Sequence, residues 1–400
     1  MKKVILFFAF ASLIASGAFA QKQLVESVQG RIGSIGTNAD AYKSVINDIQ
    51  PALTNEETKF DAHTWMTAGK AGFAFFDEFY KARMLGQEMD GIAPSLALIE
   101  GYEYFKKALP LDSVVETNKD GTPKIDKKTG KPKFKVKHSK EIQETILNHV
   151  NDFGTAGDLL REGQDYINGK KAYHAFYEIS TSDYSKAKNG GAELPDTILG
   201  QIKFLEGFCS YFGKNYDDAY ALFTDAKKLH YTQNSINDFW NAAFAYKVQD
   251  LLDAKKFDDA LATIDGAIAD NPNDAFVIDM KGIIIEEQEN DKGEQGDIEK
   301  ALPFYEKATQ VDPNFAQGFL HTGRIYYLRA AKIIDGNPDL SGDALAQKVD
   351  PICRQAEQYL EKAYSISKAA GQPDSQAKNL LGRIYYQLKE DAKAEALDKE

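Results

Sequence analysis

The chain has 400 residues, of which 43% are hydrophobic, and a formal net charge of −12 at pH 7. This acidic balance disfavours nucleic acid and bare anionic membranes as partners of the whole chain, because both carry negative charge. The length would allow two or three domains, but a repeat array is not bound by that estimate, since each repeat packs only on its neighbours.

Residues 1–20 have the pattern of a secretory signal. Two lysines precede an almost wholly apolar run at 4–16, and small residues lead up to Ala20, as a signal peptidase requires. The apolar run is shorter than the roughly 20 residues of a membrane-spanning helix. We therefore expect cleavage before Gln21, export across the inner membrane, and residence in the periplasm or at the outer envelope. Loss of the two lysines takes the net charge from −12 to −14.

A regular spacing of small and aromatic residues marks the C-terminal half of the chain. Ala301, Tyr305 and Ala308 are four and three residues apart, which places them on one face of a helix. Pro313 ends that helix, because proline lacks an N–H group and clashes with the preceding turn. Gly323 then falls in the next helical run, where a neighbouring helix must approach closely.

The same signature recurs along the chain, first at Gly207, Ala219, Phe223 and Ala226, then at Ala260, Ile264 and Ala267, at Ala356, Leu360 and Ala363, and at Gly382 and Tyr385. These residues resemble the tetratricopeptide repeat (TPR), a 34-residue helix–turn–helix unit. The resemblance covers nearly all of residues 38–397, with weaker copies in the N-terminal half. It implies an all-α, right-handed TPR solenoid of about six helical hairpins within residues 21–400. The chain also resembles exported TPR proteins of Bacteroidetes-type bacteria, in its signal, its opening "W…GK" helix and its Lys-rich insert.

Insertions interrupt the period near residues 86–94, 118–140, 288–296 and 330–352. In a solenoid such insertions map to loops on one side, often the binding side. The alternative is a tolerated surface excursion, because added loop length costs little free energy.

The insertion at 118–140 is unusual in its charge. It has nine lysines, while Ile125, Phe134 and Val136 alternate with polar residues and Thr129 precedes a glycine. This pattern predicts a small β-hairpin with a turn at its tip. It would meet an acidic partner, an anionic glycan or lipopolysaccharide, or else pack back on the acidic solenoid or stay solvated. Its candidate binding residues are Lys131, Lys133, Lys135 and Lys137.

A second candidate surface lies on the first helices of two hairpins. The sequence "GRIYY" occurs twice, so Arg324 and Arg383 follow Gly323 and Gly382 in the same repeat position. Two cations in register along a groove suit a carboxylate or an acidic peptide, although each arginine would equally pair with a neighbouring Glu. Further candidates on this surface are His321 and Tyr327.

No cofactor, metal site or catalytic constellation is predicted. The six histidines lack zinc-ligand spacing, and there is no nucleophile elbow or phosphate-binding glycine loop. Cys209 and Cys353 lie in helical patterns about 140 residues apart, so we expect free, buried thiols and no disulfide. Ser113 and Thr197 sit in patterns resembling a Bacteroidetes O-glycosylation site, and their modification stays open.

These features predict a non-enzymatic, exported scaffold that binds a peptide or an envelope protein and neither binds nucleic acid nor spans the membrane. Its oligomeric state stays open. The alternative is a glycan-binding protein of the cell envelope. Trp65 and Trp240, the two tryptophans, are few for sugar-binding platforms, and both fall at repeat positions that suggest burial.

Overall fold

The computed structural model describes residues 21–399 except 234, 340 and 341, so the predicted signal segment and Ala20 lie outside the described residues. The chain divides within helix α11 (Ile236–Asp253) into two compact units, one ending at Ala243 and the other beginning at Phe244. Each unit is described by itself.

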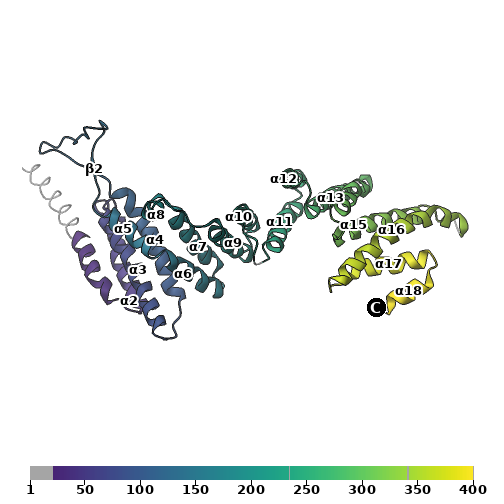
Figure 1. Cartoon of the computed structure of the whole chain (residues 1–400), viewed down its shortest axis with the longest axis horizontal. Helices are drawn as coiled ribbons and strands as arrows, with labels where there is room; N and C mark the ends of the chain where they lie inside the picture. The colour runs from purple at the N-terminus through teal and green to yellow at the C-terminus, as the bar shows by residue number, and fades with distance from the viewer. Residues whose placement is uncertain (1–20, 234, 340–341, 400) are drawn as a thin grey trace, which may run out of the picture. The chain divides into compact units, whose positions relative to one another are not determined.

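The first unit begins with helical residues 21–31, and its helices then follow one another as antiparallel neighbours (Figure 1). Packed pairs are formed by α3 with α4, α6 with α7 and α9 with α10. The elements are η1 (Ile32–Ser34), α2 (Ala39–Thr54), α3 (Ala62–Met84), α4 (Ile92–Leu111), β1 (Val114–Val115), β2 (Phe134–Lys135), α5 (Ser139–Asn148), α6 (Val150–Glu162), α7 (Tyr166–Thr181), α8 (Asp183–Lys188), α9 (Asp196–Phe212) and α10 (Tyr216–Lys228).

The second unit continues the same pattern with pairs α13–α14, α15–α16 and α17–α18. Asp274 and Asp374 are the N-cap residues of α13 and α17, because their side chains accept hydrogen bonds from N–H groups of the first turn. The elements are α12 (Phe257–Asp270), α13 (Ala275–Asp291), η2 (Gly293–Gln295), η3 (Ile298–Ala301), α14 (Leu302–Val311), α15 (Ala316–Asp335), α16 (Asp343–Ala369), α17 (Ser375–Gln387) and α18 (Asp391–Asp398).

In several hairpins a glycine of the first helix lies against a large side chain of the second helix. A Cβ added at Gly157 would lie 2.5 Å from the ring of Tyr173, and one at Gly207 would lie 2.7 Å from the ring of Phe223. Both rings come sixteen residues after their glycine and are buried. The hairpin therefore depends on a position without a side chain facing one with a large side chain.

The second unit keeps this contact although its hairpins are longer. Gly282 faces Tyr305 at 2.5 Å, and Gly323 faces Leu360 at 2.7 Å, measured from an added Cβ. These partners come twenty-three and thirty-seven residues after their glycines, so extra residues are accommodated between the helices. Helix α14 ends at Val311, before Pro313, as the sequence predicts.

The insertion at 330–352 differs from the predicted loop. Helix α15 extends to Asp335 and α16 begins at Asp343, so most of the inserted residues lengthen two packed helices. Val349 and Cys353 continue the apolar stripe of α16 backward from Ala356, and all three are buried. The predicted turn is present, because Gly336, Pro338 and Asp339 lie in the connection between the two helices, but it is short, and the residues after Gly342 follow the helical stripe instead of forming a loop.

The insertion between α4 and α5 forms the predicted antiparallel pair, with Val115 of β1 opposite Phe134 of β2. Its tip has two turns instead of one. Isolated bridges join Thr117 to Pro123 and Ile125 to Pro132, so a short middle segment pairs with both strands.

Apart from this small sheet the described chain is helical, and its fold is the predicted all-α solenoid of helical hairpins. Among the described helices none is both long and apolar enough to cross a membrane. Cys209 and Cys353 are both buried with free thiols.

Replacing Gly282 by Ala should lower the free energy of unfolding. The new methyl group would overlap the ring of Tyr305, whose hydroxyl is held by Glu286 at 2.8 Å, and overpacking costs ~1–3 kcal/mol. Gly382→Ala is the matched control, because no atom lies within 4 Å of its added Cβ. Its stability should stay unchanged or rise by up to ~1 kcal/mol through helix propensity. Urea denaturation of both variants measures the difference, and equal effects would contradict the packing role of Gly282.

Candidate functional site

A groove of about 490 Å³ crosses α4, α7, α9 and the start of α10 in the first unit. We call it the α4–α7–α9 groove. Its buried apolar lining consists of Ile99, Ala175, Cys209 and Leu222, and Ile167 lies at it with 71% of its surface exposed. Helices of successive hairpins thus contribute to one concave surface.

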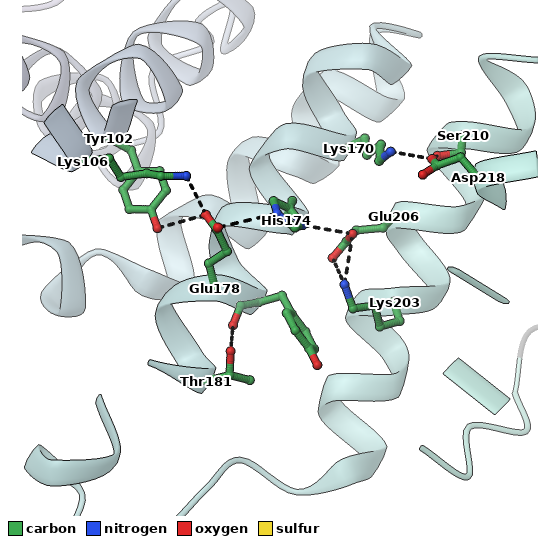
Figure 2. A network of polar contacts seen from close by, with 11 residues as sticks. Tyr102, Lys106, Lys170, His174, Glu178, Thr181, Lys203, Glu206, Ser210 and Asp218 are labelled. Carbon is green, nitrogen blue, oxygen red and sulfur yellow. Dashed lines mark hydrogen bonds and ion pairs between the residues drawn. The ribbon is translucent and has the colours of Figure 1, made fainter. Parts of the chain in front are cut away.

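Charged side chains of the same groove form a continuous network (Figure 2). Glu178 accepts hydrogen bonds from Lys106 Nζ at 3.0 Å and from Tyr102 Oη at 3.3 Å. His174 lies between two carboxylates, with Nδ1 3.3 Å from Glu206 Oε2 and Nε2 3.7 Å from Glu178 Oε1. The network therefore links α4 to α7 and α7 to α9.

The network has its deepest pair in Lys203 and Glu206, which are 8% and 1% exposed. Lys203 Nζ donates to both carboxylate oxygens of Glu206, at 3.1 and 3.3 Å, and lies 3.8 Å from the centre of the Tyr177 ring. Since removing one partner of a buried pair leaves an uncompensated charge, this pair belongs to the structural support of the groove.

Beside this network, a second group in the groove is formed by Lys170, which pairs with Asp218, and Asp218 also accepts a hydrogen bond from Ser210. Burial raises the pKa of the Cys209 thiol to about 12, so it is no nucleophile at neutral pH. The groove thus offers apolar surface and polar groups whose charges are mostly paired, while Lys171 donates only to the Asn168 side chain, at 3.0 Å, among the described residues.

In the second unit, two of the predicted binding residues are half-buried and paired with acidic side chains of the same unit. Arg324 makes a bidentate pair with Glu286, with distances of 2.7 and 2.5 Å, and Tyr305 donates to the same carboxylate. His321 Nδ1 lies 3.0 Å from Asp279. Arg324 therefore pairs with a Glu of the preceding first helix, which is the alternative that the sequence left open.

Arg383 and Tyr327, from neighbouring first helices, contact each other. The Arg383 guanidinium donates to the Tyr327 hydroxyl at 3.2 Å, and Arg383 is exposed. Tyr386, one turn further along α17, is 83% exposed. Of the two arginines predicted in register, Arg324 is half-buried and paired with Glu286, whereas Arg383 is exposed.

The four predicted lysines, Lys131, Lys133, Lys135 and Lys137, are exposed on the insertion. Lys135 and Lys137 line an open cleft of about 1070 Å³, together with Lys124. Glu26, Glu57 and Asp61 lie among the residues that line the same cleft.

One group of side chains has donor atoms within 4.8 Å of one another, as a metal site requires: Asp77, His149 and Asp152. The Nδ1–H of His149 donates to the Thr145 carbonyl at 2.7 Å, and Nε2 lies 3.0 Å from Asp77. Burial alone would lower the pKa of His149, but the hydrogen bonds to Asp77 and Thr145 raise it above its usual value. An imidazolium that caps α5 and pairs with Asp77 accounts for this geometry without a metal.

Sequence reasoning did not single out the groove. His174 and Glu206 are 32 residues apart, and carboxylates are too frequent in this chain for spacing to choose among them. One available signal was Lys203, a charged residue within the otherwise apolar start of "IKFLEGFCSYF".

No family model matches the sequence, and no curated protein sequence is similar to it. Solved structures with a similar arrangement include a TPR repeats protein from Bacteroides fragilis, with 18% identity over 59% of this chain and 98% of that one, at a TM-score of 0.32. A second is a TPR repeat-containing protein from Cytophaga hutchinsonii, with 10% identity over 89% and 99%, at 0.33. A third is YrrB, a TPR protein with an unusual peptide-binding site, with 16% identity over 57% and 92%, at 0.29.

The fold is that of tetratricopeptide-repeat proteins. The hairpin pairs and the glycine contacts within the chain itself are the basis of this assignment.

The His174 pair should make stability depend on pH. The hydrogen bond to Glu206 raises the pKa of His174, and burial opposes this only in part. A raised pKa means that the stabilisation is complete below the ordinary histidine pKa of ~6.5 and is lost as pH rises through the folded value. His174→Gln should therefore lose a few tenths of a kcal/mol at about pH 5.5 and little at about pH 9, since the ring is half-exposed. Urea denaturation at both pH values measures this, and a pH-independent loss would show that the charge of His174 contributes nothing.

Proposed function

We propose that the chain is an exported, non-enzymatic scaffold that binds a segment of a peptide or an envelope protein in the α4–α7–α9 groove. The observation that carries the proposal is the composition of this groove, which combines an apolar lining from successive hairpins with a charged rim. Its volume of about 490 Å³ lies within the usual range for small ligands and fits a few side chains of a bound segment.

The neutralised charges of the groove favour binding over catalysis. His174, Lys203 and Lys170 each have a carboxylate partner, and Lys171 donates to the Asn168 side chain, so most of the charged groups described in the groove are already engaged. A bound polypeptide would instead cover Ile167 and make polar contacts with the rim. Burying apolar surface of this kind is the main driving force of such association.

The two tryptophans do not favour glycan binding. The Trp65 indole N–H donates to the Lys59 carbonyl at 2.7 Å, and Lys107 lies over its ring. Trp240 is 8% exposed and its N–H donates to Thr224 at 2.9 Å. Neither offers a free ring face of the size that sugar stacking needs.

A photo-crosslinker at position 171, in the groove, should capture a defined segment of one envelope protein from native extract. Ile167→Asp should abolish the product, because a carboxylate would replace the exposed apolar contact. Leu85→Asp is the matched control, since Leu85 is 80% exposed and lies outside the groove. Mass spectrometry of the crosslinked peptide gives the result. The proposal is wrong if no product forms, or if both variants reduce it equally.

If the chain is exported, the mature protein should start at Gln21. Ala20→Leu should slow processing, because the signal peptidase needs a small residue there, while Ala9→Leu in the apolar run should not. Intact-mass measurement on the protein from the native host distinguishes the two. A retained Met1 in the unaltered protein would contradict the cleavage.

A further inference from the structure

The segment between α4 and α5, residues 113–138, which we call the lysine-rich insert, has a closed backbone arrangement. The N–H of Glu116 donates to the Lys133 carbonyl at 2.8 Å, that of Lys133 to Lys124 at 2.7 Å, and that of Lys124 to Glu116 at 2.7 Å. Three segments of the insert are thus tied in a ring of hydrogen bonds.

A buried carboxylate fixes the insert to the solenoid. Asp112 is 3% exposed and accepts hydrogen bonds from the N–H groups of Lys137, His138 and Ser139, at 2.6 to 3.1 Å. The Ser139 hydroxyl adds a further bond at 2.7 Å. Burial works against the charge of Asp112, but these bonds keep its pKa below the usual value. The base of the insert is therefore fixed to the helices, and we call the paired part of the insert the platform.

Strand register gives the platform two different sides. Paired residues of an antiparallel ladder, and residues two apart in a strand, point to the same side. One side is apolar except for one threonine and consists of Val115, Thr117, Pro123, Ile125, Pro132 and Phe134. The opposite side consists of Val114, Glu116, Lys124, Lys133 and Lys135, and the 3.2 Å pair between Lys124 and Glu116 agrees with this division.

The apolar side is uncovered. Ile125 is 52% exposed and Phe134 is 57% exposed, and Val136, which continues the alternation, is 58% exposed. The neighbouring cleft of about 1070 Å³ is lined mostly by residues of the segment 22–64 and by the base of the insert, including Val115 and Thr117 of the apolar side, but it does not include these three residues. Exposed apolar side chains that cluster on a rigid element mark an interaction surface.

Cations surround this apolar side. Of the nine lysines at 119–140, only Lys124 makes an ion pair with another described residue. The two acids of the tip are engaged locally: Asp120 accepts from Thr122, and Asp126 accepts from the N–H groups of Lys128 and Thr129. The turns at the tip carry the further unpaired lysines Lys119, Lys127, Lys128 and Lys131.

This surface suits a bilayer better than a protein. A stable protein interface covers about 800 Å² on each partner and centres on pockets for large side chains, whereas the apolar side offers a few exposed side chains on a small sheet. A lipid surface needs only apolar side chains that enter the headgroup region and lysines that reach phosphates. The acidic remainder of the chain counts little at the tip, since charges are screened within ~8 Å at physiological salt.

We propose that the lysine-rich insert is a peripheral membrane contact. Ile125, Phe134 and Val136 enter the headgroup region of an anionic lipid surface, and the tip lysines pair with lipid phosphates. This role is separate from polypeptide binding in the α4–α7–α9 groove.

The test is cosedimentation of the mature chain, residues 21–400, with phosphatidylcholine vesicles that contain or lack phosphatidylglycerol. Binding should require phosphatidylglycerol and weaken with salt. Ile125→Ser with Phe134→Ser should reduce it, and Lys127→Glu, Lys128→Glu and Lys131→Glu together should reduce it by about tenfold or more. The matched control carries the same three charge changes at exposed lysines of the second unit, Lys307, Lys348 and Lys362, and should bind as the unaltered chain does.

Each other outcome overturns the proposal. Equal binding to both vesicle types, or binding that the control changes as much as the insert variants, would show nonspecific attraction. Binding of free glycerol phosphate without vesicle binding would leave a phosphate site and no membrane contact. Binding of an acidic polypeptide such as polyglutamate without vesicle binding would assign the insert to a protein partner. Because the altered residues are exposed, the variants should fold like the unaltered chain. Their melting temperatures check this and should be unchanged.

Discussion

The contact between a glycine of the first helix and a large side chain of the second is the constraint on which this solenoid depends. In the hairpins that have this contact, the helices approach closely where one of them has no side chain, and the facing ring or leucine fills the space. Tyr305 shows how the contact is secured, because its ring lies against Gly282 and its hydroxyl is bound by Glu286. The same carboxylate holds Arg324 of the next hairpin, so one buried acid ties the packing within a hairpin to the stacking between hairpins.

Buried charges connect successive hairpins in both units. In the first unit His174 joins α7 to Glu206 of α9, and in the second Arg324 joins α15 to Glu286 of α13. Such pairs cost desolvation, so they add less to stability than their short distances suggest. Their geometric demands, however, favour one register between neighbouring repeats, which apolar contacts alone would leave less defined.

Much of the fold could be predicted from the sequence, because the pattern that defines it is local. The four-then-three spacing of Ala301, Tyr305 and Ala308 lies within one helix, and Pro313 marks its end. The paired strands of the lysine-rich insert were predictable from the alternation around Phe134, but its second turn was not, since it requires knowing that Thr117 faces Pro123. The helical extensions within 330–352 were missed because inserted residues were expected to form a loop, whereas only 336–342, which contains the Gly and Pro residues up to Gly342, connects the two helices.

The candidate sites were harder to predict from the sequence than the fold, for a physical reason. The α4–α7–α9 groove joins residues from helices that are distant in sequence, and only the stacking angle of the hairpins brings them together. Arg324 and Arg383 occupy the same repeat position, yet one is bound by Glu286 and the other is exposed. Equivalent positions in a repeat thus acquire different roles through the neighbour that each one meets.

The glycine contact also explains how the chain tolerates hairpins of unequal length. Tyr305 and Leu360 contact their glycines despite the extra residues that precede them. The length of the connection between two helices therefore does not change how these helices pack on each other. The number of residues in that connection can therefore change, in evolution or by engineering, while the packing of the hairpin is kept. A binding loop or a reporter peptide grafted between α13 and α14 would inherit a rigid base, and the repeats on either side would keep their register.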